Sequence, residues 1–279
     1  MSTFVFLIVL LAALMHASWN AMVKSTGDKM VSMTAITLGH APLAIVAIPF
    51  FPLPAPESWP LLVASVIVHT CYQLMLATSY RLGDYTQVYP IARGSGPAIV
   101  MLISVFALGV AFVPTQYAAI GLICLGIFCL ALLRRDGMRN PKAVGAALVT
   151  GCFIAGYSLL DGLGARAAGT AIGYIAWLTL INAAVFALLM GLLHRPALVG
   201  ALGEGRKILI FGGGASVLAY AVVVWAMTQA PIALVTALRE TSTIFALLIG
   251  IVFLKERFTV WKLLATLLVL TGVVLLRVG

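Results

Sequence analysis

The chain has 279 residues, of which 63% are hydrophobic and only 9% are charged. This composition excludes a soluble protein, which would need a larger polar surface, and it predicts an all-α polytopic membrane protein. The apolar runs are continuous rather than alternating, which is not the pattern of a transmembrane β-barrel. The net charge of +9 does not indicate nucleic-acid binding, because the basic residues lie in short loops between apolar runs, as in membrane proteins.

Apolar runs of about 18–25 residues, the length that a membrane-spanning helix needs, follow one another along the whole chain. The connections are short, so we expect no soluble domain. The first run lacks a basic leader and a small-residue cleavage site, so we expect it to be retained as a helix. The sequence predicts ten transmembrane helices, at residues 3–23, 31–52, 59–80, 86–110, 116–133, 143–164, 171–193, 207–228, 231–254 and 259–276.

The longest basic loop, residues 134–142, separates the fifth run from the sixth and divides the chain into residues 1–138 and 139–279. An odd number of spans in each half predicts two inverted five-helix repeats, the plan of many secondary transporters. A shift of 146 residues places Arg93 on Arg239 and Gly126 on Gly272 without a gap. The run of glycines at 212–214 indicates a close contact between helices.

The distribution of basic residues predicts the orientation. Most of the 17 lysines and arginines fall in alternate loops, which the positive-inside rule places in the cytoplasm. With ten spans, both ends of the chain are then expected on the outer side of the membrane.

Polar residues within the runs recur at a spacing of four, which places each pair on one face of a helix. Polar faces cost little free energy in a membrane when they converge on a polar interior, so we expect a central cavity. A local hydrogen-bonded contact between packed helices is the alternative for any single pair. The pairs are His16 with Asn20, His69 with Gln73, Tyr89 with Arg93, Tyr157 with Asp161, and Thr236 with Glu240.

Arg93 and Arg239 are each expected roughly 12 Å inside the membrane, from opposite faces. Charges at this depth are costly, so they predict a ligand site or a gate. An internal salt bridge of Arg239 with Glu240 or Asp161 is the alternative. Successive residues of a helix point about 100° apart, so Arg239 and Glu240 are not expected to face one partner together.

Asp161 is open to two interpretations, a carboxylate at the interfacial end of its helix or a site for a proton or a cationic group. His16, His40 and His69 lie within spans, where they could relay protons, bind a solute or serve in packing. The four cysteines fall in apolar runs and indicate buried small residues rather than a metal site. The sequence contains no motif for catalysis, so we expect no enzyme activity, no metal and no cofactor.

Several short motifs resemble those of the drug/metabolite transporter superfamily, EamA type. They are Ala17–Asn20, Tyr89–Pro97, Leu238–Ser242 and Leu254–Phe258. The first half departs from that pattern, since Gly109-Val110-Ala111 stands where the family has a Glu-Arg turn. The resemblance, which covers nearly the whole chain, implies a secondary carrier in the bacterial inner membrane, often an exporter linked to protons.

The expected substrate is a small molecule carrying both charges, such as an amino acid, because the expected cavity offers both signs of charge and aromatic faces. The candidate binding residues are His16, Trp19, Asn20, His69, Gln73, Tyr89, Arg93, Tyr157, Asp161, Arg239 and Glu240. An exporter of cationic drugs, with Asp161 or Glu240 exchanging protons, is the alternative. A membrane enzyme acting on lipid-linked groups is a minor one.

Overall fold

The computed structural model describes residues 1–24, 28–83, 85–132, 140–252 and 260–278. Within these ranges the secondary structure is helical, without strands. Nine helical segments in these ranges are long and apolar enough to cross a membrane, and α6 (Pro114–Leu132) adds a shorter apolar stretch, Pro114–Cys129. The prediction of an all-helical polytopic membrane protein is confirmed. The predicted boundary at residues 138–139 and the motif Leu254–Phe258 lie outside the described residues.

Besides α6, six of the long helices begin and end within a few residues of the predicted spans. Each apolar run is bounded by polar or turn-forming residues, which fix these ends. Asn140, for example, caps its helix by accepting hydrogen bonds from the backbone N–H groups of Lys142 and Ala143. These helices are α1 (Thr3–Lys24), α4 (Trp59–Leu82), α5 (Tyr85–Phe106), α7 (Pro141–Ala167), α8 (Ala171–Leu193) and α13 (Val260–Val278).

Three predicted spans are interrupted, which corrects the expectation of continuous helices. The second span consists of α2 (Lys29–Gly39), α3 (Ala41–Ala47) and the short turn η1 (Ile48–Phe50). The break falls at His40, two residues before Pro42, which has no backbone N–H to continue the ladder of hydrogen bonds. The eighth span begins with a wider π-helical segment, η3 (Ile208–Gly213), and continues as α10 (Gly214–Gln229). The ninth span consists of α11 (Ile232–Arg239) and α12 (Ser242–Val252).

Two short elements stand outside the predicted spans. They are η2 (Pro56–Ser58), which leads into α4, and α9 (Arg195–Leu202), which follows α8. Both are too short to cross a membrane.

The polarity of the fold is that of a membrane protein. Large apolar side chains such as Leu7, Phe106 and Leu192 are exposed on the outer surface, where lipid would cover them. The charged side chains of Asp161 and Glu240 are instead completely buried. The interior therefore holds polar groups that must satisfy one another or a bound solute.

Glycines allow close helix contacts at two places. A Cβ atom on Gly39 would lie 2.0 Å from the carbonyl oxygen of Leu209, and one on Gly213 would lie 2.6 Å from the Cα atom of Gly39. The glycine run at 212–214 therefore marks a close contact between helices, as predicted.

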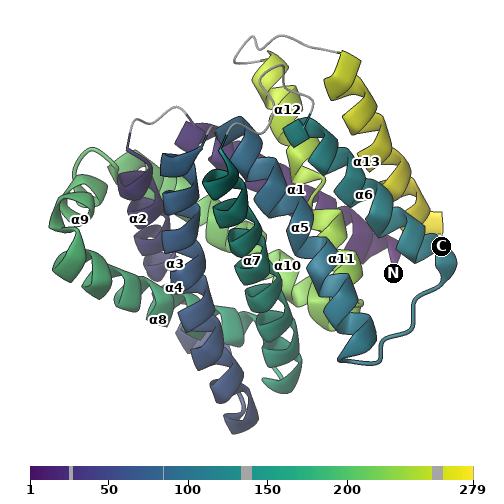
Figure 1. Cartoon of the computed structure of the whole chain (residues 1–279). Coiled ribbons are helices and arrows are strands. Elements are labelled where there is room, and N and C mark those ends of the chain that lie inside the picture. Colours follow the sequence, from purple (N-terminus) through teal and green to yellow (C-terminus); the bar gives the residue numbers. More distant parts are fainter. Residues whose placement is uncertain (25–27, 84, 133–139, 253–259, 279) are drawn as a thin grey trace.

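The second close contact is between α6 and α13, which lie side by side in Figure 1.

The contact between α6 and α13 is reciprocal. A Cβ atom on Gly126 would lie 2.8 Å from the carbonyl oxygen of Ala265, and one on Gly272 would lie 2.7 Å from that of Ala119. A shift of 146 residues converts Ala119 into Ala265 and Gly126 into Gly272, so it exchanges these two contacts. This pattern is the one expected of two elements related by a twofold axis.

The two ends of the chain meet. The guanidinium of Arg277, near the end of α13, donates a hydrogen bond of 2.6 Å to the hydroxyl of Thr3 at the start of α1, and both termini lie beside these helices in Figure 1. That both ends are external stays a prediction from the loop charges.

Candidate functional site

A cavity of about 90 Å³ lies between helices from both halves of the chain. This volume has room for several water molecules or a small polar solute. Helices α1, α2, α4, α7, α10 and α11 and the junction at His40 contribute to its wall. The wall is formed by Ala12, His16, Trp19, Met33, Ile36, Thr37, His40, His69, Tyr72, Gln73, Tyr157, Ser216, Ala219, Tyr220, Val223 and Arg239.

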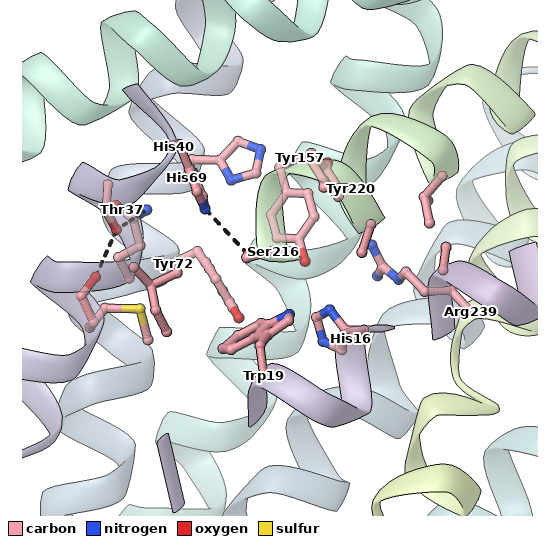
Figure 2. Close-up of a pocket in the computed structure, with 16 residues that line it drawn as sticks. His16, Trp19, Thr37, His40, His69, Tyr72, Tyr157, Ser216, Tyr220 and Arg239 are labelled. Atoms are coloured by element: carbon pink, nitrogen blue, oxygen red, sulfur yellow. Dashed lines mark hydrogen bonds between the residues drawn. The ribbon is translucent and has the colours of Figure 1, made fainter. Parts of the chain in front are cut away.

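Six of the eleven candidate binding residues line this cavity, and five lie beside it or away from it. The lining residues are His16, Trp19, His69, Gln73, Tyr157 and Arg239, all of which are drawn in Figure 2. Asn20, Tyr89, Arg93, Asp161 and Glu240 are not part of the wall.

The α1 side of the cavity is formed by His16 and Trp19. Their rings meet edge to face with centroids 4.9 Å apart, and they lie next to each other in Figure 2. The indole Nε1 of Trp19 is buried and has no hydrogen-bond partner among the described residues. Asn20 donates to the backbone oxygen of His16 at 2.8 Å, so its amide supports the helix rather than the cavity.

Arg239 brings a positive charge to the cavity wall. It is the last residue of α11, its side chain is only 3% exposed, and its guanidinium lies 5.9 Å from the centroid of the Tyr157 ring. Nε lies 3.6 Å from Oε1 of Glu240, whereas Nη2 has no hydrogen-bond partner in the described part of the chain. A buried donor without a partner is costly, so this atom is suited to an acceptor on a solute.

Arg93 is paired behind the cavity. Its Nε lies 2.8 Å from Oε2 of Glu240, its Nη2 donates to the hydroxyl of Ser242 at 3.2 Å, and its guanidinium lies 5.8 Å from the Tyr89 ring. Glu240 thus faces Arg93 and Arg239 together.

The internal salt bridge of Arg239 with Glu240, expected as the alternative, is present with Nε and Oε1 3.6 Å apart, because the two residues do not lie in one uninterrupted helix. Arg239 ends α11, and Glu240 lies in the turn before α12 with φ −69° and ψ −9°. In this turn the angular spacing of a regular α-helix no longer applies. The carboxylate can therefore reach both neighbouring guanidinium groups.

Asp161 is the centre of a second polar cluster. Its carboxylate accepts hydrogen bonds from the hydroxyls of Ser65 and Tyr220, lies 2.9 Å from Nε2 of His69, and is 3.5 Å from the hydroxyl of Tyr174. The interpretation of Asp161 as an interfacial carboxylate was wrong, because α7 continues to Ala167 and the side chain is fully buried.

His69 joins the Asp161 cluster to the cavity. Its ring stacks on Tyr157 with centroids 4.3 Å apart and meets Tyr220 edge to face at 5.6 Å. All three rings line the cavity, whereas Asp161 lies behind them.

Gln73 forms the polar part of the α4 wall. Its Nε2 donates to the hydroxyl of Thr37 and to Oδ1 of Asn182, both at 3.0 Å. Its Oε1 is buried without a partner among the described residues. The cavity therefore has two unused donors, on Trp19 and Arg239, and one unused acceptor.

Several lining residues were absent from the sequence prediction. Thr37, Tyr72, Ser216 and Tyr220 were not proposed, and His40 was noted only as a histidine within a span. His40 lies 3.3 Å from the hydroxyl of Ser216 through Nε2. Ser216 and Tyr220 have the same spacing of four as the proposed pairs, so a complete search for that spacing would have found them. Within the described residues, no group of three His, Cys, Asp or Glu side chains is arranged to hold a metal ion.

Comparisons with known proteins agree with this architecture. Residues 141–278 match the model of the EamA-like transporter family. A solved structure described only as "Crystal structure of protein" aligns with 99% of this chain and 96% of its own, with a TM-score of 0.73 and 18% identity. At that identity the likeness concerns the fold alone. No curated protein matches the chain.

Proposed function

We propose that this multi-pass membrane protein, whose residues 141–278 belong to the EamA-like transporter family, is a secondary carrier for a small zwitterion such as an amino acid. The single observation that carries the proposal is the set of buried polar atoms without partners on the cavity wall, Trp19 Nε1, Arg239 Nη2 and Gln73 Oε1. Two donors suit a carboxylate, and the acceptor suits an ammonium group.

The carboxylate of the solute would bind near Arg239, because a guanidinium is the strongest available donor to a carboxylate. Its ammonium group would then point toward the α4 wall, where Gln73 offers an oxygen and Tyr72 and Tyr157 offer aromatic faces. A cavity of about 90 Å³ limits the solute to a small one. This assignment leaves Arg93 and Glu240 as supports of Arg239.

We further propose alternating access between two inverted five-helix repeats. The reciprocal glycine contacts between α6 and α13 support this symmetry. So does the packing of α4 on α7, which the same shift of 146 residues relates to the packing of α10 on α1. The cavity lies between elements of both halves, where rocking of one half against the other would open it to each side in turn.

The alternative of a cationic drug exporter has less support. Asp161 and Glu240 would have to serve as counter-ions, but both are fully buried, hold other partners and lie outside the cavity wall. We propose export of the zwitterion across the inner membrane of a bacterium, with the basic loops cytoplasmic.

The direct test is counterflow in proteoliposomes that contain the purified full-length chain. Each of the twenty L-amino acids is supplied in radiolabelled form outside vesicles loaded with the same unlabelled compound. We expect accumulation of one or a few small amino acids, and we expect Arg239→Gln to abolish it. Arg195→Gln, at the exposed start of α9, is the matched control and should keep the wild-type rate.

The proposal fails if none of the amino acids accumulates, or if Arg239→Gln accumulates them at the wild-type rate. Thermal unfolding of each purified variant separates loss of the site from loss of the fold.

A further inference from the structure

We propose that His69 and Asp161 form a proton-binding pair whose proton leaves when the ammonium group of the solute enters the cavity. This inference rests on the proposed function for the identity of the solute, whereas the proton site itself rests on the geometry of the pair. It assigns the coupling step to two named side chains.

The first argument is the position of the two groups. Asp161 is fully buried behind the cavity wall, and His69 lies on that wall with Nε2 2.9 Å from Oδ2 of Asp161. His69 is therefore in contact both with a buried carboxylate and with the space that a solute and water would occupy. An imidazole is the side chain that gains and loses a proton near neutral pH.

The second argument concerns which nitrogen takes the proton. The carboxylate of Asp161 accepts hydrogen bonds from Ser65 and Tyr220, so it acts as the acceptor of its cluster. The Nε2–H group of His69 donates to this carboxylate, which leaves Nδ1 as the nitrogen that can take a further proton. A proton from cavity water binds to Nδ1, and the carboxylate stabilises the resulting imidazolium. Release returns the same proton from Nδ1 to water.

The third argument is the balance of charge. The buried arginines Arg93 and Arg239 are balanced by Asp161 and Glu240 when His69 is neutral. An additional proton on His69 gives this interior one positive charge. An excess positive charge is costly in an interior of low polarity, which favours loss of this proton when a second cationic group approaches His69.

The fourth argument is competition for the same wall. His69 precedes Gln73 by four residues on α4, so both lie on one face, and both line the cavity. The ammonium group proposed to bind Gln73 Oε1 would lie beside a protonated His69 and repel it. Solute and proton therefore exclude each other, and an inward proton gradient drives the solute outward.

Other titratable or charged groups face the pair from every neighbouring element, and a measured pH dependence includes their influence. The aromatic hydroxyls are those of Tyr72, Tyr157, Tyr174 and Tyr220, and the remaining groups are His16, His40 and Arg239.

The test of the proton site needs no solute. The full-length chain is labelled with ¹⁵N-histidine, placed in lipid nanodiscs and followed by NMR between pH 5 and pH 8, with His69→Gln used to assign the His69 signals. We expect the His69 signals to change with pH, and to change differently in Asp161→Asn, because the ring then lacks its carboxylate partner. A His69 ring that keeps one protonation state throughout, or that titrates identically in Asp161→Asn, overturns the proposal.

The test of coupling compares two kinds of transport in the same vesicles. Proteoliposomes carry a lumenal pH dye and a mixture of the twenty L-amino acids, and a pH gradient is applied. The wild type should move protons against the amino acids, whereas His69→Gln and Asp161→Asn should lose this proton movement. Counterflow, which needs no net proton, is measured in the same vesicles, and the ratio of proton movement to counterflow should fall in both variants. An unchanged ratio in either variant overturns the coupling pair. His194→Asn, which keeps an acceptor at the N-terminus of α9, is the matched histidine control.

The outcomes separate the two proposals. Proton movement that persists in His69→Gln overturns the coupling pair even if the carrier is active. Absence of counterflow in the wild type overturns the proposed solute, and the solute exchange proposed here with it, while NMR titration of His69 still decides the proton site.

Discussion

Arg93 Nε and Glu240 Oε2 lie 2.8 Å apart, with their side chains 3% and 0% exposed, and the pair joins α5 to the break between α11 and α12. Glu240 also lies near Arg239, so one carboxylate serves two guanidinium groups. The pair holds the end of α11, and with it Arg239, in place at the cavity. Helix α5 therefore supports the site without lining it.

Replacing Glu240 with glutamine should destabilise the protein, since it leaves two buried guanidinium groups without a counter-ion. Removing one partner of a buried ion pair costs on the order of 3 kcal/mol. Thermal unfolding in detergent should show a clearly lower midpoint. Glu204→Gln, at an exposed position, is the control and should melt like the wild type. An unchanged midpoint for Glu240→Gln would mean that the ion pair does not stabilise the fold.

The two arginines should respond differently to replacement by lysine. Arg239→Lys keeps the charge but loses the planar donor group on the cavity wall, so we expect the affinity for the solute to fall about 10- to 100-fold. Arg93→Lys should leave the affinity close to that of the wild type and lower the unfolding midpoint instead. The half-saturation concentration in counterflow and the thermal midpoint measure the two effects. Equal loss of affinity in both variants would contradict the assignment of Arg93 as a support.

Replacing Trp19 with phenylalanine removes one buried donor and keeps an aromatic ring. Because Nε1 has no partner among the described residues, its removal should leave the unfolding midpoint of the empty protein unchanged or raise it. The affinity for the solute should fall by roughly fivefold, the value of a lost hydrogen bond of about 1 kcal/mol. A lower midpoint together with unchanged affinity would show that the indole serves packing alone.

Leucine at Gly126 or at Gly272 should separate α6 from α13, since either side chain would meet backbone atoms of the other helix. Such overpacking costs about 1–3 kcal/mol, and reciprocal contacts should give two variants of similar cost. Thermal unfolding is the measurement. Gly121→Leu is the control on α6, because a Cβ atom there has nothing within 4 Å. If the unfolding midpoints of the two variants differ by as much as either differs from the wild type, the result would count against the twofold relationship.

The sequence was sufficient to predict an all-helical membrane protein, because the thickness of the membrane sets the length of an apolar run. It was also sufficient for His69 and Gln73, whose spacing of four places both on the cavity wall. The same spacing wrongly placed Asn20 on the cavity wall. One turn further along α1, its amide bonds back to His16, and spacing alone cannot distinguish that bond from a cavity contact.

The pairing of Arg93 with Glu240 could not be predicted, because it depends on how α5 and α11 are rotated toward each other. The break after Arg239 has no proline to mark it, so a continuous helix was the simpler expectation. Asp161 was placed too near the helix end, since Ala165 and Ala167 continue α7 beyond the expected boundary. Its four partners come from three other helices and are far apart in the sequence.

Because Thr3 and Arg277 are in contact, the two halves of the chain could be joined in the opposite order. A gene that starts at residue 140, joins Gly279 to Met1 by a few linking residues and stops at residue 132 would produce the same helices with the halves exchanged. Every contact within and between the described helices would be available to such a circular permutant. Transport by such a permutant would show that the arrangement of the bundle depends on how the helices pack and not on which half the ribosome makes first.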